Sequence, residues 1–137
     1  MDLNNAKVLV TGGSMGIGYS AAKVLTEAGA KVVICGRDAT RLEAAARELG
    51  AIPITADVSK ESDVVNLIAK TIEALDGYNV LINNAAYGYF SPLTGIDTAK
   101  FNEVLMTNIT GAMMCGRESA KYFTEKNYGN IVNIASS

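Results

Sequence analysis

The chain has 137 residues, enough for one domain with a hydrophobic core and too few for two ordinary domains. Hydrophobic residues make up 49% and charged residues 19%, which argues against disorder, and the net charge of −2 gives no electrostatic reason to expect nucleic acid or an anionic membrane surface as a partner. No apolar run approaches the roughly 20 residues of a membrane-spanning helix, and the N-terminus lacks the pattern of a secretory signal.

Cysteine and histidine usage narrows the chemistry further. The two cysteines, Cys35 and Cys115, are isolated in apolar surroundings, and the chain has no histidine. Without a CxxC pair or a histidine, we expect no metal site, and every Ser-His or Cys-His triad is excluded. These features are typical of a reduced cytoplasmic protein.

Strand-like and helix-like segments alternate along the whole chain. Short apolar runs predict strands over residues 7–12, 31–36, 51–58, 78–86 and 129–136. Helical spacing of apolar residues predicts helices over residues 16–29, 38–50, 59–77 and about 98–126, with Asp38 or Thr40 as the N-cap of the second and Gly50 as its end. Continuous apolar strands are typical of a parallel sheet covered on both faces. The alternation predicts one α/β domain over residues 1–137, with a doubly wound sheet.

The segment TGGSMGIG, residues 11–18, connects the first predicted strand to the first predicted helix. Its glycines, Gly12, Gly16 and Gly18, follow a G-x-x-x-G-x-G spacing. Residues without a Cβ allow backbone amides to approach a pyrophosphate, and the N-terminus of the next helix favours negative charge. A glycine-rich turn without a ligand is the alternative, which the position between a strand and a helix disfavours.

The end of the second predicted strand bears on which dinucleotide would bind. A carboxylate there would accept hydrogen bonds from the adenosine ribose, whereas an arginine would bind a 2′-phosphate. The strand ends in ICGRD, so Gly36 and Arg37 precede Asp38. This order favours NADP(H), with NAD(H) as the alternative. Arg37 could also be an ordinary solvated surface arginine.

Together these motifs resemble the short-chain dehydrogenase/reductase family, in register from about residue 6 to the end. TGGSMGIG is similar to the family's TGxxxGxG loop, ADV at residues 56–58 to its acidic turn after the third strand, and NNAA at residues 83–86 to its NNAG motif, with Ala86 in place of glycine. The resemblance implies a Rossmann-type fold with strand order 3-2-1-4-5. It also implies cofactor binding by Gly12, Ser14, Met15, Gly16, Ile17, Gly18, Arg37, Asp57, Val58, Asn84 and Ala85.

Two further motifs imply catalytic residues by the same resemblance. MTNITG carries Asn108, which would distort its helix and support a proton relay, and NIVNIASS carries Ser136, which would polarise the substrate carbonyl, with Ser137 as the neighbouring alternative. The residue types alone leave other interpretations open. Asp57 could be a helix N-cap, Asn83 and Asn84 turn residues, Asn108 a solvent-facing polar residue, and Ser136 a strand-end cap.

The family's Tyr-x-x-x-Lys pair would follow Ser136, and the 137-residue sequence stops before it. Tyr19 and Tyr122 each have a lysine four residues later, but their positions in the predicted fold lie away from a nicotinamide, so we expect neither to be catalytic. We therefore expect the amino-terminal portion of an NADP(H)-dependent oxidoreductase that interconverts a carbonyl and a secondary alcohol, with a small-molecule substrate and a homo-oligomeric state. A truncated dinucleotide-binding or interaction module without turnover is the alternative. With the C-terminal strands missing, the fifth strand would be an open edge prone to pairing.

Overall fold

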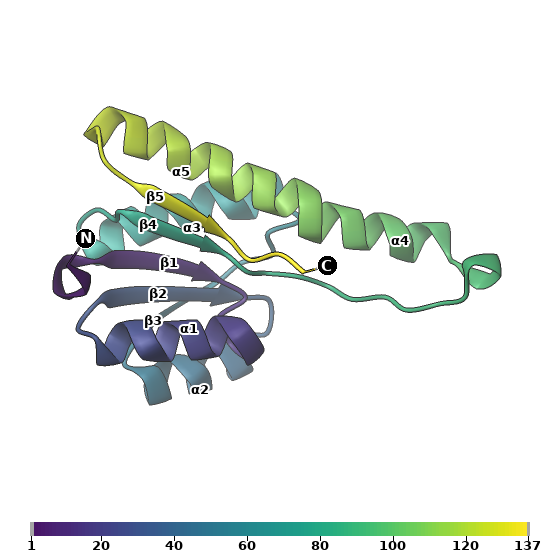
Figure 1. Ribbon diagram of the computed structural model, residues 1–137, viewed down its shortest axis with the longest axis horizontal. Helices are drawn as coiled ribbons and strands as arrows, with labels where there is room; N and C mark the ends of the chain where they lie inside the picture. The colour runs from purple at the N-terminus through teal and green to yellow at the C-terminus, as the bar shows by residue number, and fades with distance from the viewer. Residues whose placement is uncertain (1, 137) are drawn as a thin grey trace.

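The computed structural model describes residues 2–136, whose five strands form one parallel sheet between two layers of helices (Figure 1). The strands are β1 (Lys7–Thr11), β2 (Lys31–Gly36), β3 (Ile52–Thr55), β4 (Val80–Asn83) and β5 (Asn130–Asn133). Their order across the sheet is β3-β2-β1-β4-β5, which confirms the predicted topology. The order reverses between β1 and β4, because the chain crosses from β3 at one edge to the other side of β1.

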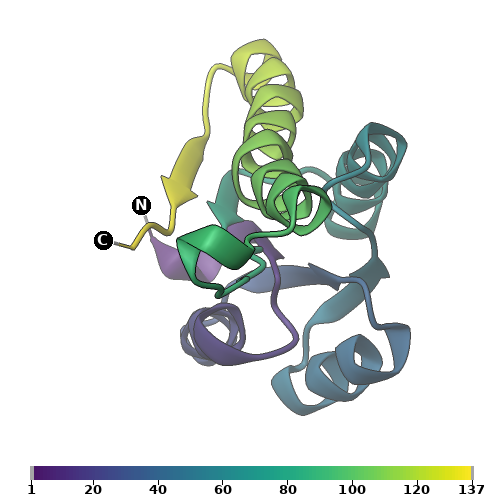
Figure 2. The same ribbon diagram turned by 90° about the vertical axis from the view of Figure 1, so that its right-hand side faces the viewer.

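The helices cover both faces of the sheet, as Figure 2 shows from the end of the molecule. They are α1 (Gly16–Glu27), α2 (Ala39–Leu49), α3 (Glu61–Leu75), α4 (Thr98–Leu105) and α5 (Ala112–Lys126), with short 3-10 turns at Leu3–Asn5 and Leu93–Gly95. Helices α1 and α2 pack on one face, and α3 and α5 on the other. Among residues 2–136, no helix has the length and apolar character that crossing a membrane requires.

The central strand explains why the apolar runs are continuous. Val8 and Val10 pack toward α1 and α2, while Leu9 between them packs toward α3 and α5. All three side chains are fully buried. Because successive side chains of a strand point to opposite faces, a sheet covered on both sides requires apolar residues at every position.

The ends of α2 match the predicted signals. The Asp38 carboxylate accepts a hydrogen bond from the backbone amide of Arg41 (2.9 Å), so Asp38 rather than Thr40 is the N-cap. Gly50 ends the helix in the left-handed conformation at φ +67°.

The predicted strands are too long at their carboxyl ends. β3 ends at Thr55, the partner of Gly36 at the end of β2, and β4 ends at Asn83, the partner of Asn133. The residues beyond these points have lost their neighbouring strand, so they turn out of the sheet. The predicted strand regions 56–58 and 84–86 therefore become loops at the carboxyl edge.

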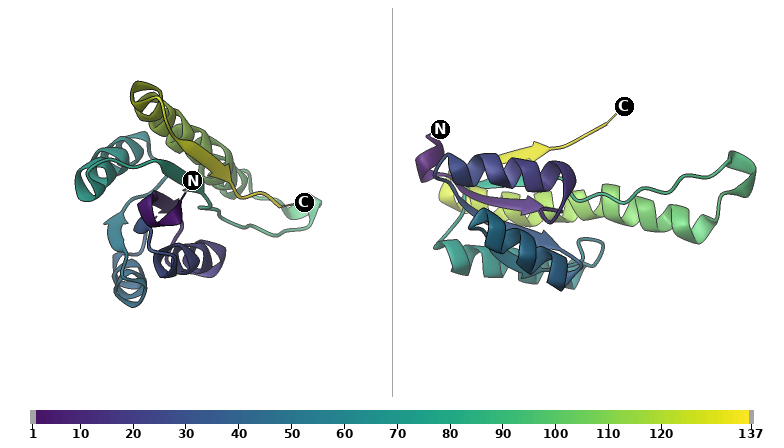
Figure 3. Two further views of the ribbon diagram at one scale, coloured as in Figure 1. Left: turned by 60° about the vertical axis from the view of Figure 1, so that its left-hand side comes forward. Right: turned by 90° about the horizontal axis from the view of Figure 1, so that it is seen from below.

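The predicted long helix near residues 98–126 is a continuous helical rod with one distortion. A π-helical segment, η3 (Met106–Gly111), separates α4 from α5. The rod extends beyond the sheet. The loop between β4 and α4 leads outward alongside this extension (Figure 3). Helix α4 in this extension has no buried residue.

Strand β5 forms one edge of the sheet and is incompletely covered. Its Ile131 and Val132 side chains are 39% and 44% exposed, whereas the corresponding residues of β1 are fully buried. An apolar edge strand is a surface on which further chain can pair.

Candidate functional site

An open cavity of about 700 Å³ lies at the carboxyl edge of the sheet, beside the ends of β1, β2 and β4. Ligands of doubly wound sheets bind at this edge, where the strand order reverses. Of the predicted cofactor-binding residues, the cavity is lined by Gly12, Ser14, Met15, Arg37, Asp57, Val58, Asn84 and Ala85. The other three, Gly16, Ile17 and Gly18, form the first turn of α1 and do not line this cavity.

The glycine loop packs tightly because three of its glycines, Gly12, Gly13 and Gly18, have no room for a side chain. Gly12 has φ +67°, and a Cβ there would lie 2.9 Å from the Ala85 Cα. A Cβ on Gly18 would collide with the carbonyl oxygen of Gly12 and the Nδ2 of Asn84. The loop backbone is therefore held against the end of β4, and its backbone stays accessible along the cavity wall, as a phosphate cradle requires.

Thr11 and Asn84 hold the glycine loop to the loop after β4. The backbone amides of Asn84 and Ala85 both donate to the Thr11 Oγ1 at 3.0 Å. In return the Asn84 Nδ2 donates to the carbonyl oxygens of Thr11 and Gly12 (3.0 and 3.1 Å). Asn84 thus satisfies backbone groups, as the turn interpretation expects, but those groups belong to the glycine loop 72 residues away.

Asp57 lies at the cavity wall and forms a local turn. Its Oδ1 accepts hydrogen bonds from the Ser59 amide (3.0 Å) and the Ser59 hydroxyl (2.6 Å). The N-cap position of α3 is Lys60, so the N-cap interpretation of Asp57 is wrong. Partial burial raises the pKa of the Asp57 carboxyl, but the Ser59 hydrogen bonds and the positive charge of Arg37 outweigh it and bring the pKa below its ordinary value.

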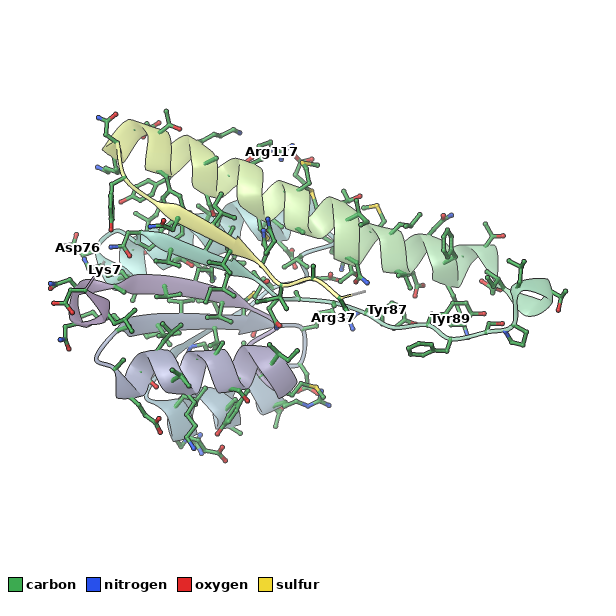
Figure 4. The ribbon with its side chains drawn as sticks, in the orientation of Figure 1. Lys7, Arg37, Asp76, Tyr87, Tyr89 and Arg117 are labelled. Atoms are coloured by element: carbon green, nitrogen blue, oxygen red, sulfur yellow. The ribbon has the colours of Figure 1, made fainter. Side chains whose placement is uncertain are left out.

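Arg37 follows β2 directly, and Figure 4 places it with Tyr87 at the carboxyl edge, far from Lys7 and Asp76 at the opposite edge. Its guanidinium carbon lies 6.0 Å from the centre of the Tyr87 ring. No carboxylate among residues 2–136 lies within ion-pair distance of Arg37. The side chain therefore lines the cavity with a charge that has no ion-pair partner in the described part of the chain.

A second cavity of about 540 Å³ adjoins the first and contains both predicted catalytic residues, Asn108 and Ser136. Asn84 and Ala85 line both cavities. Ile17 of α1 also lines the second one. The two predicted catalytic side chains therefore share a space that borders the predicted cofactor site. Ser137 lies outside the described residues.

Asn108 sits in the π-helical segment, and its side chain pairs with the backbone of Tyr87. Its Oδ1 accepts from the Tyr87 amide (2.8 Å), and its Nδ2 donates to the Tyr87 carbonyl oxygen (3.0 Å). The predicted helix distortion at this residue is confirmed, and the solvent-facing interpretation is wrong. The predicted role of Asn108 in a proton relay stays a prediction.

Comparison with known proteins agrees with this arrangement of loop, sheet and cavity. The family model for short chain dehydrogenases matches residues 6–137. This chain belongs to the short-chain dehydrogenase family. It is 40% identical over 96% of its length to a glucose 1-dehydrogenase of Gluconobacter oxydans (strain 621H), of which it covers 52%. It therefore spans about half the length of the curated relatives it matches.

Solved structures of short-chain dehydrogenases share the fold. A short chain dehydrogenase from Bacillus anthracis str. 'Ames Ancestor' matches with a TM-score of 0.93 and 31% identity, covering 98% of this chain and 58% of that one. A short chain dehydrogenase from Mycobacterium smegmatis gives the same TM-score and identity, covering 99% and 60%. The described sheet thus corresponds to somewhat more than half of each relative.

The tyrosines of both Tyr-x-x-x-Lys segments make contacts away from the two cavities. The Tyr19 hydroxyl donates to Glu48 on α2 at 2.8 Å, and this hydrogen bond raises the Tyr19 pKa, the opposite of what a catalytic base needs. Tyr122 stacks on Tyr78 with ring centres 5.4 Å apart. Neither tyrosine lines either of the two cavities.

Sequence reasoning missed the role of Asn83, which is a buried strand residue and not a turn residue. Its Nδ2 donates to the carbonyl oxygen of Ala112 (3.2 Å) and to the Asn133 side chain (3.0 Å). Its Oδ1 is buried without a hydrogen-bond partner in residues 2–136. One side chain thus connects β4 both to β5, which leads to Ser136, and to the end of the π-helical segment, which carries Asn108.

Two other residues of the first cavity, Arg41 and Thr107, were also missed. Arg41 has a signal in the sequence, because it lies three residues after the predicted N-cap Asp38 and therefore in the first turn of a helix that begins at the same edge. Thr107 has none, because its place at the cavity depends on the π-helical segment.

Proposed function

We propose that this chain is the nucleotide-binding part of an NADP(H)-dependent short-chain oxidoreductase that interconverts a carbonyl and a secondary alcohol by hydride transfer. One observation carries the proposal. The cavity at the point where the strand order reverses has a glycine loop on one wall and, on another, Arg37, a cation without an ion-pair partner among residues 2–136. Such a cavity fits a dinucleotide with an additional phosphate.

The preference for NADP(H) rests on how Asp38 is used. A carboxylate that recognises NAD(H) must have an oxygen free for the ribose hydroxyls. Asp38 instead uses Oδ1 to cap α2, so this carboxylate is already committed to the helix. Arg37 then remains as the group that can bind the ribose end of the cofactor.

In the complete enzyme, Ser136 would orient the substrate oxygen and Asn108 would support the proton relay. Bound NADP(H) would supply the hydride chemistry, and Asn84 and Ala85, which line both cavities, would help to hold it. The proton would come from a tyrosine outside residues 1–137, because Tyr19 and Tyr122 are held elsewhere. The glucose 1-dehydrogenase of Gluconobacter oxydans is a relative named for a reaction in this class.

A binding or interaction module without turnover is a second candidate. The feature that favours it is the contrast between the two cavities. The first cavity is lined by part of the glycine loop, Arg37 and Asp57, which suit a dinucleotide, whereas among the described residues neither cavity contains a tyrosine–lysine pair for acid–base chemistry. Binding without activity would be its signature.

We further propose a cytoplasmic homo-oligomer. Two buried free thiols, Cys35 and Cys115, suit a reducing compartment. The exposed apolar side chains of β5 provide a surface for association, and sedimentation velocity over a concentration series measures it.

The test is titration of the purified 137-residue chain with NADPH, followed by nicotinamide fluorescence. Gly18→Ala should abolish saturable binding, because its Cβ would displace the glycine loop from Asn84. Gly95→Ala is the matched control. The Gly95 Cβ would meet only the Ser91 Oγ, at 3.4 Å, far from either cavity. Circular dichroism checks that both variants remain folded.

Saturable binding that Gly18→Ala removes and Gly95→Ala preserves supports the proposed cofactor site. Absence of binding by the folded wild-type chain contradicts it. Carbonyl-dependent oxidation of NADPH by this chain would overturn the non-catalytic alternative.

A further inference from the structure

The wall of the first cavity near the end of β2 carries two arginines, and only one belongs to the predicted site. Arg41, in the first turn of α2, lines the same cavity as Arg37. The cavity also contains two carboxylates, Asp38 and Asp57, but each accepts hydrogen bonds from the protein itself. The two guanidinium groups are the positively charged hydrogen-bond donors that line this cavity.

In the described part of the chain, the Arg41 guanidinium has two polar contacts, and both are weak. Its Nη1 donates to the Met15 sulfur at 3.4 Å, and thioether sulfur is a poor acceptor. Its Nη2 lies 3.8 Å from the Asp38 carboxylate, near the upper limit for an ion pair, and the Arg41 side chain is 56% exposed. The Met15 contact connects α2 to the glycine loop, and a phosphate could replace it at little cost because Arg–phosphate pairs are stronger.

Gly36 lines the same cavity as both arginines, and packing does not explain why this residue is a glycine. A Cβ on Gly36 would lie 3.5 Å from the Ser14 Oγ and 3.6 Å from Leu42, which is ordinary van der Waals contact. Its φ is not in the left-handed range either. The backbone would therefore accept alanine, and the glycine leaves the room of that methyl group beside Ser14, in the cavity that both arginines line.

We infer that Arg41 is a second specificity-determining residue, which binds the 2′-phosphate of NADP(H) together with Arg37 in the space left by Gly36. The inference rests on the proposed function and adds a residue to it. On binding, the Arg41 guanidinium exchanges the Met15 sulfur for phosphate oxygens. A phosphate dianion is then matched by two cations, and Asp38 keeps its capping role.

The test compares two small probes by calorimetry, adenosine 2′,5′-bisphosphate and adenosine 5′-monophosphate, on the 137-residue chain. Arg41→Gln keeps the unbranched, polar character of the side chain and its helix propensity while removing the guanidinium and its charge. It should weaken binding of the bisphosphate about tenfold and leave the monophosphate within about twofold. Arg41→Lys should fall between wild type and Arg41→Gln, because an ammonium cannot form the bidentate pair.

Arg47→Gln is the matched control, on the same helix and exposed but away from the cavity. If Arg41→Gln and Arg47→Gln bind the bisphosphate equally well, the inference is wrong. Equal weakening of both probes by Arg41→Gln also overturns it. The wild-type chain could prefer the bisphosphate, with Arg37→Ala removing this preference and Arg41→Gln retaining it. That result would support the proposed function and contradict only the inference about Arg41. Failure of the wild-type chain to bind either probe contradicts the proposed function itself.

Discussion

Arg37 contributes a positive charge to a cavity whose carboxylates are already hydrogen-bonded. Its contact with the Tyr87 ring at 6.0 Å holds the guanidinium at the carboxyl edge without neutralising it. The nearby Asp57 carboxyl has a pKa below its ordinary value in part because of this charge. We therefore expect single side chains to decide cofactor preference at this cavity, and each can be tested one residue at a time.

Arg37→Ala should weaken NADPH binding at least about tenfold and leave NADH binding nearly unchanged, because only NADPH carries the 2′-phosphate. Parallel titrations with NADPH and with NADH measure the two affinities. Arg47→Ala, which removes one charge from an exposed site on α2, should change neither affinity. Equal weakening of both coenzymes, or of neither, would refute the assignment of Arg37.

At the scale of elements, the π-helical segment is where the rod of α4 and α5 passes the end of β3. Gly111, its last residue, lies so close to the loop after β3 that a Cβ there would be 2.8 Å from the Val58 carbonyl oxygen. Asn108, one turn earlier, pairs with the Tyr87 backbone. The segment thus joins the rod to both cavities, and extra π turns of this kind are frequent at functional sites.

Two glycines of this rod provide a matched pair. Gly111→Ala should lower the free energy of unfolding by about 1–3 kcal/mol, because the new methyl must push the rod away from Val58. Gly116→Ala, five residues on in α5, should raise it by up to about 1 kcal/mol. Its Cβ would have only the Asn83 Nδ2 as a neighbour, at 3.9 Å, and alanine is the better helix former.

Urea unfolding of the two variants followed by circular dichroism measures both changes. A Gly111→Ala variant as stable as Gly116→Ala would show that the close approach of the rod to Val58 does not exist in solution.

At the scale of the whole molecule, one hydrophobic core contains both thiols. Cys35 of β2 and Cys115 of α5 belong to the same buried cluster, on the face covered by α3 and α5. Burial raises the pKa of each thiol to about 12. Burial likewise raises the pKa of Tyr78, in the same cluster, to about 12. The pKa values of these groups therefore depend on whether the core excludes water.

The thiols should make the protein less stable as the pH rises above about 8.5. Unfolded cysteines lose their protons near that pH, while the folded ones keep theirs until about 12. Their contribution is fully present below pH 8.5 and is lost progressively up to about pH 12, by as much as about 1.4 kcal/mol per pH unit for each thiol. Urea unfolding at pH 7, 9 and 10 measures the slope.

The double variant Cys35→Ala and Cys115→Ala is the control, because it removes both groups and should flatten this part of the pH dependence. Thiol labelling at pH 8 gives an independent readout. Labelling of the native chain as fast as that of the urea-unfolded chain would contradict a closed core.

The sequence by itself determined the features that depend on neighbouring residues. The apolar runs and helical spacing predicted all five strands and their helices, because a sheet buried on both faces needs apolar residues at every strand position. Asp38 and Gly50 marked the ends of α2, since capping acts within one turn. The glycine loop and Arg37 were found in the same way, from their positions beside predicted strand ends.

Only the tertiary structure decided which distant groups meet. The Asn84 amide reaches the carbonyl oxygens of Thr11 and Gly12, Asn83 connects β4 to both β5 and the rod, and Asn108 pairs with Tyr87 across 21 residues of chain. An asparagine side chain can serve equally in a turn, a cap or a long-range pair, so its type and local sequence do not select among them. The choice is made by packing, which brings a particular buried backbone group within hydrogen-bond distance and excludes the water that would otherwise satisfy it.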